Sequence, residues 1–320
     1  MAATASPATM VPDASLLPNV LPTHRLQASG MPVPLVRESL RHIPNGRNLL
    51  NVAGVWLQSF GVIAAATWVN QPVGWLIAFA LMGRAFALYA ILGHEAAHRL
   101  LFSNRKFNDV IGRWGLSYPA FVPFDLYRRS HMSHHKDEMG PAEPDLNLYV
   151  GYPISRASMT RKLRRDAFGN SGWKSLKGLL LALKSPVGKG IAIRILGVQL
   201  VIAVALTIGT RHWWAYPVLW LAPWMTIWRV INRLRAIAEH GGMIQSKDRR
   251  LTTHVVRQSW IARFWMVPFN TGWHLAHHVD MGVPFRNLPQ LHRELTQSGW
   301  VIDELEYRSY RDLWRALAAG

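Results

Sequence analysis

Long apolar segments alternate along the chain with polar segments that carry histidines. Residues 49–69 and 72–93 are apolar runs of about 20 residues, the length at which a helix crosses a bilayer. A tight Asn70-Gln71-Pro72 break separates them. Residues 191–208 and 213–231 form a second pair of runs with a short turn between them. We therefore predict an all-α integral membrane protein with four transmembrane helices in two hairpins.

Basic residues lie at one end of both predicted hairpins. Arg47 precedes the first run and Arg99 follows the second, whereas the turn between these two runs has no Lys or Arg. Arg233 follows the fourth run. Positive charge favours the cytoplasmic side, so both termini and a helical cap are expected in the cytoplasm. The cap comprises residues 94–190 and 232–320.

The remaining segments complete the predicted organisation. Residues 1–34 are rich in Ala, Pro, Ser and Thr and are expected to be disordered, which leaves 35–320 as the membrane domain. A positively charged start followed by an apolar core is missing, so no cleaved signal peptide is expected. We expect a multi-pass protein of a bacterial inner membrane. Arg84 lies deep in the second run, where we favour a structural interhelical contact; a pair with Gln199 or approach to a lipid or substrate headgroup are the alternatives.

Composition supports a membrane protein and excludes some kinds of metal site. Charged residues make up 17% of the chain, and 15 residues are Trp. Soluble proteins usually have about 25% charged residues. The net charge of +18 fits the cytoplasmic face of a membrane, and we find no nucleic-acid-binding motif and expect no such partner. There is no cysteine, so a metal would be bound by histidine, carboxylate, amide or water.

Three histidine clusters stand out from the polar segments, and all lie on the predicted cytoplasmic side. Their members are His94 and His98; His131, His134 and His135; and His274, His277 and His278. Residues three and four apart share one face of a helix, so each cluster can direct its nitrogens into one volume. Neutral imidazole is the commonest metal ligand in proteins.

The number of imidazoles favours two metal ions. One zinc ion takes four ligands, and eight imidazoles exceed that. The segment His94-Glu95-Ala96-Ala97-His98 also matches the HExxH pattern of zinc proteases, but that interpretation leaves both other clusters unexplained. Surface histidines on amphipathic helices are the structural alternative. A redox pair of metals held by nitrogen ligands is suited to oxygen activation by iron.

The order HxxxH, HxxHH, HxxHH, with hairpins between, resembles the membrane fatty acid desaturase family of histidine-rich di-iron enzymes. The resemblance covers roughly residues 45–300, and Ala238-Glu239-His240 and the stretch from Asn270 to His278 strengthen it. It implies nine metal ligands: His94, His98, His131, His134, His135, His240, His274, His277 and His278. Asn270 is expected to orient a ligand or a metal-bound water. Candidate acceptors for the imidazole N–H groups are Glu239, Asp137, Asp145 and Asp109.

The resemblance also implies an activity. It predicts an oxygen-dependent oxidoreductase with two iron ions and O2 as co-substrate, which introduces a carbon–carbon double bond into an acyl chain. The substrate is expected to be an acyl-lipid, with acyl-CoA or an acyl carrier as alternatives. Electrons would come from a separate donor such as ferredoxin with its reductase. Two alternatives remain: a lipid or carotenoid hydroxylase or ketolase of the same superfamily, and a non-enzymatic metal-binding membrane protein.

Overall fold

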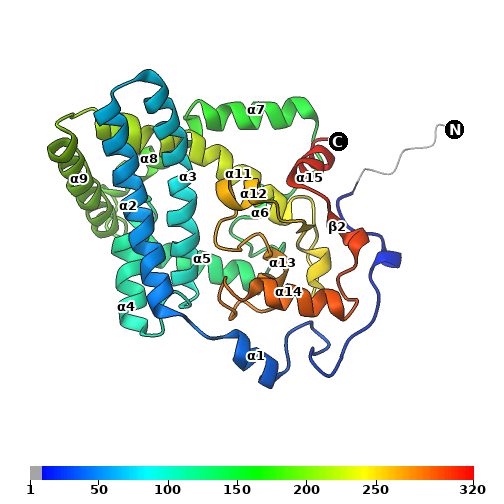
Figure 1. The fold of residues 1–320 in the computed structure, drawn as a ribbon. Coiled ribbons are helices and arrows are strands. Elements are labelled where there is room, and N and C mark those ends of the chain that lie inside the picture. Colours follow the sequence, from blue (N-terminus) through cyan, green and yellow to red (C-terminus); the bar gives the residue numbers. More distant parts are fainter. Residues whose placement is uncertain (1–8) are drawn as a thin grey trace. The chain divides into compact units, whose positions relative to one another are not determined.

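The computed structural model describes residues 9–320, and helices dominate it (Figure 1). Residues 1–8, the start of the segment expected to be disordered, lie outside the described residues. The described rest of that segment is residues 9–34. It contains the short helix η1 (Ala14–Leu16) and an isolated bridge between Leu26 and Pro32. Leu26 of this segment is buried.

The chain divides into two compact units. That residues 35–320 form one membrane domain stays a prediction. Unit 1 comprises the residues up to 42, 130–162 and 233–320, and unit 2 comprises 43–129 and 163–232. The chain passes between the units at residues 42–43 and within three helices. These are α5 (Phe124–Lys136), α7 (Arg156–Ala167) and α11 (Ile227–His240).

Unit 2 contains three helices that are long and apolar enough to cross a membrane. They are α2 (Asn45–Val69), α3 (Pro72–Ala97) and α9 (Lys189–Thr210). Helix α2 packs beside both α3 and α9 (Figure 1). Leu57 of α2, Leu76 of α3 and Val201 of α9 are 74%, 72% and 68% exposed, as expected for side chains that face lipid. Three of the four predicted spans thus correspond to continuous helices.

The fourth predicted span, residues 213–231, is not one continuous helix. The segment is divided among the π-helix η3 (Pro217–Leu221), the short helix α10 (Ala222–Met225) and the start of α11. Pro217 and Pro223 supply no backbone N–H, which favours interruptions in an otherwise apolar helix. A fourth crossing therefore remains a prediction. The other elements of unit 2 are α4 (Arg105–Val110), the π-helix η2 (Ile111–Ser117) and α8 (Asn170–Ala182).

Arg84 makes the interhelical contact expected of it, but with a different partner. Its Nη1 atom donates to Gln58 Oε1 of α2 at 2.6 Å. Gln199 instead donates to the carbonyl oxygens of Tyr118 and Pro119, at 2.8 and 3.0 Å. Each of these long polar side chains therefore forms hydrogen bonds with a neighbouring segment of unit 2, as a polar group buried among apolar helices requires.

Unit 1 is built from short helices and one small sheet. Strands β1 (Val255–Val256) and β2 (Glu306–Tyr307) pair in parallel, with Val255 opposite Glu306. Its other elements are α1 (Pro34–Leu40), α6 (Leu146–Tyr149), η4 (Arg249–Leu251), α12 (Trp260–Trp265), α13 (His274–Val279), α14 (Leu288–Gln297), η5 (Asp303–Leu305) and α15 (Tyr310–Leu317).

The core of unit 1 holds α13 in place. Leu288, Leu291 and Leu295 lie on one face of α14 and are buried, and α14 packs against α13. Arg37 of α1 adds a bidentate ion pair with Asp280, which directly follows α13; its Nε atom donates to Oδ2 at 2.6 Å. An apolar face and a fixed charge pair thus position the helix that carries the third histidine cluster.

Candidate metal centre

Four histidines of unit 1 point their Nε2 atoms at one small buried volume. They are His134 of α5, His240 at the end of α11, and His274 and His278 of α13. His274 Nε2 lies 3.0 Å from both His240 Nε2 and His278 Nε2, and His134 Nε2 lies 3.4 Å from His278 Nε2. All four rings are buried. We call them the four-histidine group.

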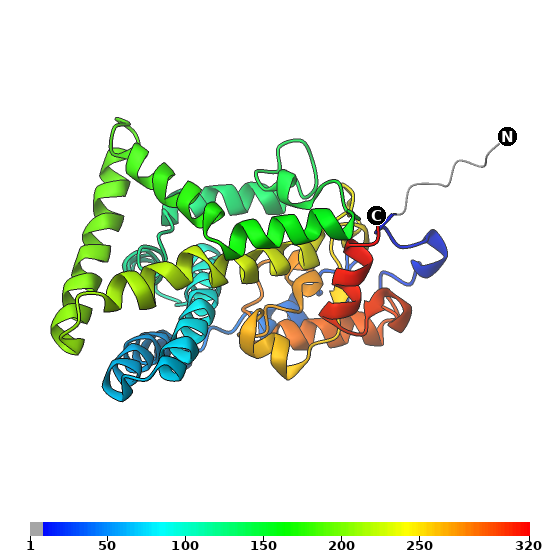
Figure 2. The same ribbon diagram turned by 90° about the horizontal axis from the view of Figure 1, so that it is seen from above.

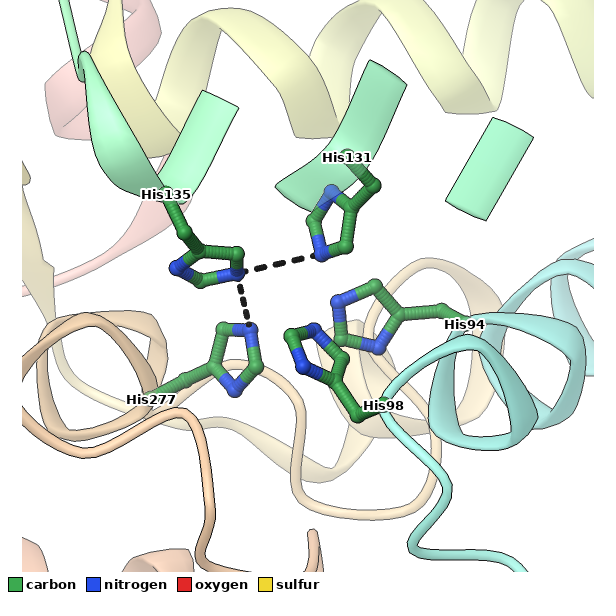
Figure 3. Close-up of side chains that lie close together, drawn as sticks. All are labelled: His94, His98, His131, His135 and His277. Carbon is green, nitrogen blue, oxygen red and sulfur yellow. Dashed lines mark hydrogen bonds between the residues drawn. The ribbon is translucent and has the colours of Figure 1, made fainter. Parts of the chain in front are cut away.

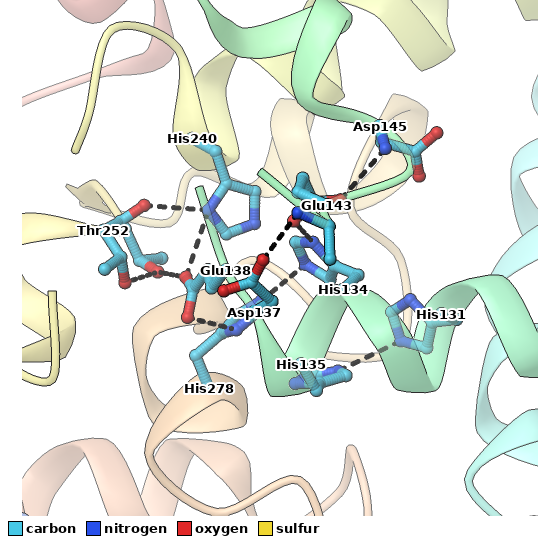
Figure 4. A network of polar contacts seen from close by, with 12 residues as sticks. His131, His134, His135, Asp137, Glu138, Glu143, Asp145, His240, Thr252 and His278 are labelled. Atoms are coloured by element: carbon cyan, nitrogen blue, oxygen red, sulfur yellow. Dashed lines mark hydrogen bonds and ion pairs between the residues drawn. The ribbon is translucent and has the colours of Figure 1, made fainter. Parts of the chain in front are cut away.

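Carboxylates and one carbonyl oxygen surround the outer nitrogens of this group (Figure 4). His134 Nδ1 lies 2.5 Å from Glu143 Oε2, and His278 Nδ1 lies 3.1 Å from Glu138 Oε2. His240 Nδ1 lies 2.8 Å from the Thr252 carbonyl oxygen and 3.3 Å from Glu138 Oε1. His274 Nδ1 lies 3.5 Å from Glu239 Oε1. Acceptors at Nδ1 place the proton there and leave an Nε2 lone pair for a metal.

The charges around Glu138 keep it ionised. Burial alone would raise the pKa of its carboxyl, but His240 and Arg249 outweigh burial and hold the pKa well below its usual range. Thr253 also donates its hydroxyl to Glu138 Oε1 at 2.7 Å. The carboxylate in turn outweighs the effect of burial on His240, whose pKa lies above its usual value. Glu138 thus places a fixed negative charge beside two rings.

The rings of His274 and His278, by contrast, favour the neutral form. Burial is the main cause that depresses the pKa values of His274 and His278 well below 6.5, and neighbouring imidazoles add to the shift. Because the Nδ1 atoms of His274 and His278 face carboxylates, the Nε2 lone pairs of these neutral rings face one another 3.0 Å apart. A cation between these nitrogens would remove that repulsion, so the group fits a metal ion.

Three further histidines of unit 1 form a second set, the three-histidine group (Figure 3). His135 Nε2 lies 3.1 Å from His131 Nε2 and 3.0 Å from His277 Nε2. His131 and His135 are one helical turn apart on α5, and His277 is on α13. The second and third clusters are therefore each divided between the two groups, because adjacent histidines such as His134 and His135 point in different directions.

His94 and His98 lie together within unit 2, with ring centroids 4.7 Å apart. Helix α3 continues through Ala97, so the two rings share one face as the spacing predicts. Arg128 secures this helix end, since its guanidinium donates to the carbonyl oxygens of Ala96 and Ala97 at 3.0 and 3.1 Å. Figure 3 shows both rings at this helix end.

Most of the predicted acceptors have other partners. Asp109 accepts two hydrogen bonds from Arg128, the shorter one 2.5 Å long. Asp137 accepts from Gln245 Nε2 at 2.8 Å, and Asn270 accepts from Arg263 at 3.3 Å. Asp145 donates its backbone N–H to Glu143, and burial raises the pKa of its own carboxyl. Of the predicted set, Glu239 is the residue whose carboxylate lies beside a ligand ring in the described part of the chain, with Oε1 3.5 Å from His274 Nδ1.

Sequence reasoning missed Glu138 and Glu143. Both follow the second cluster closely, but they lie in the loop after α5 ends at Lys136. Helical spacing gives no direction for loop side chains, so Asp137 and Asp145 were equally plausible acceptors. The usable signal was an excess of acidic residues directly after a histidine cluster, in a chain with only 18 Asp and Glu residues.

Comparisons with known proteins point to a single family. The sequence matches the family model described as "Fatty acid desaturase" over residues 49–311. It is 25% identical to dihydrorhizobitoxine desaturase of Bradyrhizobium elkanii, over 71% of this chain and 70% of that protein. It is 23% identical to sn-1 oleoyl-lipid 12-desaturase of Anabaena variabilis, over 81% and 78%. A shorter match, 34% identical over 27% of this chain and 19% of the relative, is sn-2 acyl-lipid omega-3 desaturase (ferredoxin) of Helianthus annuus.

Proposed function

Because the chain belongs to the fatty acid desaturase family of oxidoreductases, we propose that it introduces a carbon–carbon double bond into an acyl chain of a membrane lipid. The single observation that carries this proposal is the four-histidine group, whose inward nitrogens and outer carboxylates suit a catalytic metal. Because the family consists of oxidoreductases, His94 and His98 do not need to be interpreted as the HExxH motif of a zinc protease.

Two iron ions fit the available donors. The four-histidine group would hold one ion and the three-histidine group the other. We propose His94 and His98 as further ligands on the basis of the family's three-cluster pattern. Support comes from the convergent Nε2 atoms within unit 1, from the pairing of His94 with His98 within unit 2, and from the family's three-cluster pattern. Imidazole and carboxylate ligands without thiolate suit iron.

When bound, the two ions supply the redox chemistry: O2, two hydrogens of adjacent methylenes, two external electrons and two protons give the alkene and two waters. The protein's own residues prepare the site for this. The Glu143 carboxylate lies within hydrogen-bond distance of His134 Nδ1, and Glu138 and Glu239 place carboxylates beside the Nδ1 atoms of His278 and His274, which favours a proton on these outer nitrogens. Burial of the rings excludes water from the reacting volume.

The substrate in this proposal is an acyl group attached to a lipid. The Anabaena and Helianthus relatives carry acyl-lipid substrates in their names. Helices α2, α3 and α9 expose broad apolar surfaces, which fits a protein that meets its substrate within a bilayer. The Bradyrhizobium relative is named for a different substrate, so acyl-CoA or an acyl carrier is an outcome that the test below separates.

Electrons come from a separate carrier such as ferredoxin with its reductase. The name of the Helianthus relative includes ferredoxin, and this chain has no cysteine for an iron–sulfur cluster of its own. The family is membrane-bound. We further propose that residues 213–231 complete a fourth crossing and that the histidine clusters and both termini are cytoplasmic in a bacterial inner membrane. The basic residues that follow the second and fourth runs support this orientation.

Lipid analysis tests the proposed activity. The wild-type chain and a His134→Ala variant are expressed, with a ferredoxin and its reductase, in a host that lacks unsaturated lipids of the product class. We expect mass spectrometry to show lipids that have lost two hydrogens, in the wild-type cells alone. A product that has gained oxygen would instead indicate a hydroxylase or ketolase. A product found only on acyl-CoA would contradict the lipid-linked substrate.

A further inference from the structure

Unit 2 contains an apolar groove with a volume of about 400 Å³, outside the histidine groups. Phe121, Leu126, Leu179, Ile191, Trp224 and Trp228 supply much of its lining. Ligand sites in proteins usually have volumes of about 300 to 1,000 Å³. The groove lies among α8, α9 and residues 120–126, and Figure 2 shows α8 and α9 meeting at an angle.

One cation lines this otherwise apolar groove. The Arg229 guanidinium lies 4.1 Å from the centroid of the Trp224 ring. Its Nε atom is buried and has no hydrogen-bond partner, and no carboxylate of the described chain forms an ion pair with it. Asp166 attracts Arg229 only at longer range. A desolvated guanidinium without an anion favours a ligand that brings a negative charge.

The wall behind Arg229 is held in a defined shape. Trp224 packs against Phe121 with ring centroids 4.2 Å apart, and its Nε1–H donates to the Ala120 carbonyl oxygen at 3.0 Å. Phe121 has a φ of 61°, which a residue with a bulky side chain rarely adopts. Strained backbone of this kind is concentrated at functional sites. Specific contacts and an uncommon backbone conformation therefore define the shape of this wall of the groove.

Helix α8 joins the groove to a basic and apolar surface. Its residues Gly178 and Leu179 line the groove, whereas Lys174 and Lys177 are exposed on the same helix. Leu181 is also exposed. A helix with lysines beside exposed apolar side chains suits the interface of an anionic membrane.

We propose that this groove binds an acyl chain of an anionic phospholipid of the surrounding bilayer, whose phosphate pairs with Arg229. The apolar lining takes the chain, and the lysines of α8 attract the headgroup to the groove mouth. The inference goes beyond the proposed function, because it requires a membrane-bound family but neither iron nor turnover. It assigns the chain a preference for one class of bilayer lipid.

Gly178 offers a way to fill the groove without disturbing the fold. A Cβ atom at Gly178 would meet no atom within 4 Å, so Gly178→Leu can project into open groove space. Gly190 of α9 is exposed and has equally free space, but it does not line the groove. Both substitutions replace a helical glycine with a strong helix former, so Gly190→Leu is a matched control.

Native mass spectrometry of the purified full chain in detergent tests the proposal. Phosphatidylglycerol and phosphatidylcholine with identical acyl chains are titrated separately. We expect wild type and Gly190→Leu to retain one phosphatidylglycerol tightly, and Gly178→Leu to bind it at least about tenfold more weakly. Arg229→Gln should lose the preference for phosphatidylglycerol, and Arg229→Lys should keep most of it. Excess inorganic phosphate should not displace the lipid.

Equal binding of the two lipids by wild type would overturn the proposal, as would unchanged binding by Gly178→Leu. Displacement by inorganic phosphate would overturn the lipid as occupant and indicate a free-phosphate site. If Arg229→Gln does not fold, as judged by its melting temperature, the comparison of Gly178→Leu with Gly190→Leu still tests the proposal. Because no step requires turnover, failure here is distinguishable from failure of the desaturase assignment.

Discussion

The Glu138 carboxylate lies 3.1 Å from the Nδ1 atom of His278, and the same carboxylate also reaches His240 at 3.3 Å. One loop residue therefore orients two rings of the four-histidine group, which come from different helices. Carboxylates that hold a ligand's second nitrogen commonly change metal affinity by about 10- to 100-fold when removed.

Glu138→Gln should accordingly weaken the metal in the four-histidine group by about 10- to 100-fold. The neutral amide keeps the size of the side chain but loses the charge beside His240 and His278. Iron loss against a chelator, followed with purified protein, measures the effect. The control is Asp137→Asn at the neighbouring position, because the Asp137 carboxylate accepts a hydrogen bond from Gln245 and none from a histidine. Equal iron loss in both variants would contradict the role of Glu138.

Glu143→Gln should have a smaller effect than His134→Ala. Glu143 contacts one ring, at 2.5 Å from His134 Nδ1, so its loss leaves the ligand itself in place. We expect His134→Ala to abolish desaturation while the protein still inserts into the membrane, and Glu143→Gln to retain partial activity. His24→Ala, at an exposed histidine outside both groups, should behave as wild type in the same lipid assay. Full activity of His134→Ala would refute the site.

Asp109 should contribute a pH-dependent part of the stability of unit 2. Its hydrogen bonds from Arg128 hold the pKa of the Asp109 carboxyl below 3.8, although partial burial opposes the shift. A depressed carboxyl pKa stabilises the fold above the unfolded-state value, and this contribution disappears as pH falls through the folded-state value. The melting temperature of Asp109→Asn in detergent should therefore lie below that of wild type at pH 7. The gap should close below about pH 4; a constant gap would contradict this account.

Arg37→Met should destabilise unit 1 by about 2 kcal/mol, because it removes a charge-assisted pair and leaves a buried carboxylate without its partner. Asp280 is 2% exposed and directly follows α13, so the loss should also loosen the helix that carries His274, His277 and His278. Denaturant unfolding in mixed micelles measures the change. Arg37→Lys should recover part of the stability. No difference between Arg37→Met and wild type would show that α1 does not secure α13.

Apolar length was sufficient to predict three long helices. The runs 49–69, 72–93 and 191–208 correspond to α2, α3 and α9, and α3 extends four residues further, to Ala97. The run 213–231 is also apolar on average but contains two prolines. A hydropathy average does not include the backbone N–H group that each proline lacks. Apolar composition therefore predicted a continuous helix at a place where the backbone chemistry of proline favours interruptions.

The histidines were predictable because helical spacing brings i, i+3 and i+4 to one face. The spacing could not show that His134 and His135 serve different groups, since this depends on how α5 meets α13. The carboxylates around the rings were harder still. Glu138 and Glu143 lie in a loop, and their directions follow from partners distant in sequence, such as Arg249 and Thr253. No periodic pattern records such contacts.

The iron content of purified protein shows whether two separable sets of histidines each hold a metal. Wild type, loaded under reducing conditions and freed of loosely bound metal, should hold two irons per chain. His274→Ala should lose iron from the four-histidine group and His131→Ala from the three-histidine group, so each variant should retain about one. Wild-type protein that binds a single metal, or variants that both keep two irons, would contradict the account.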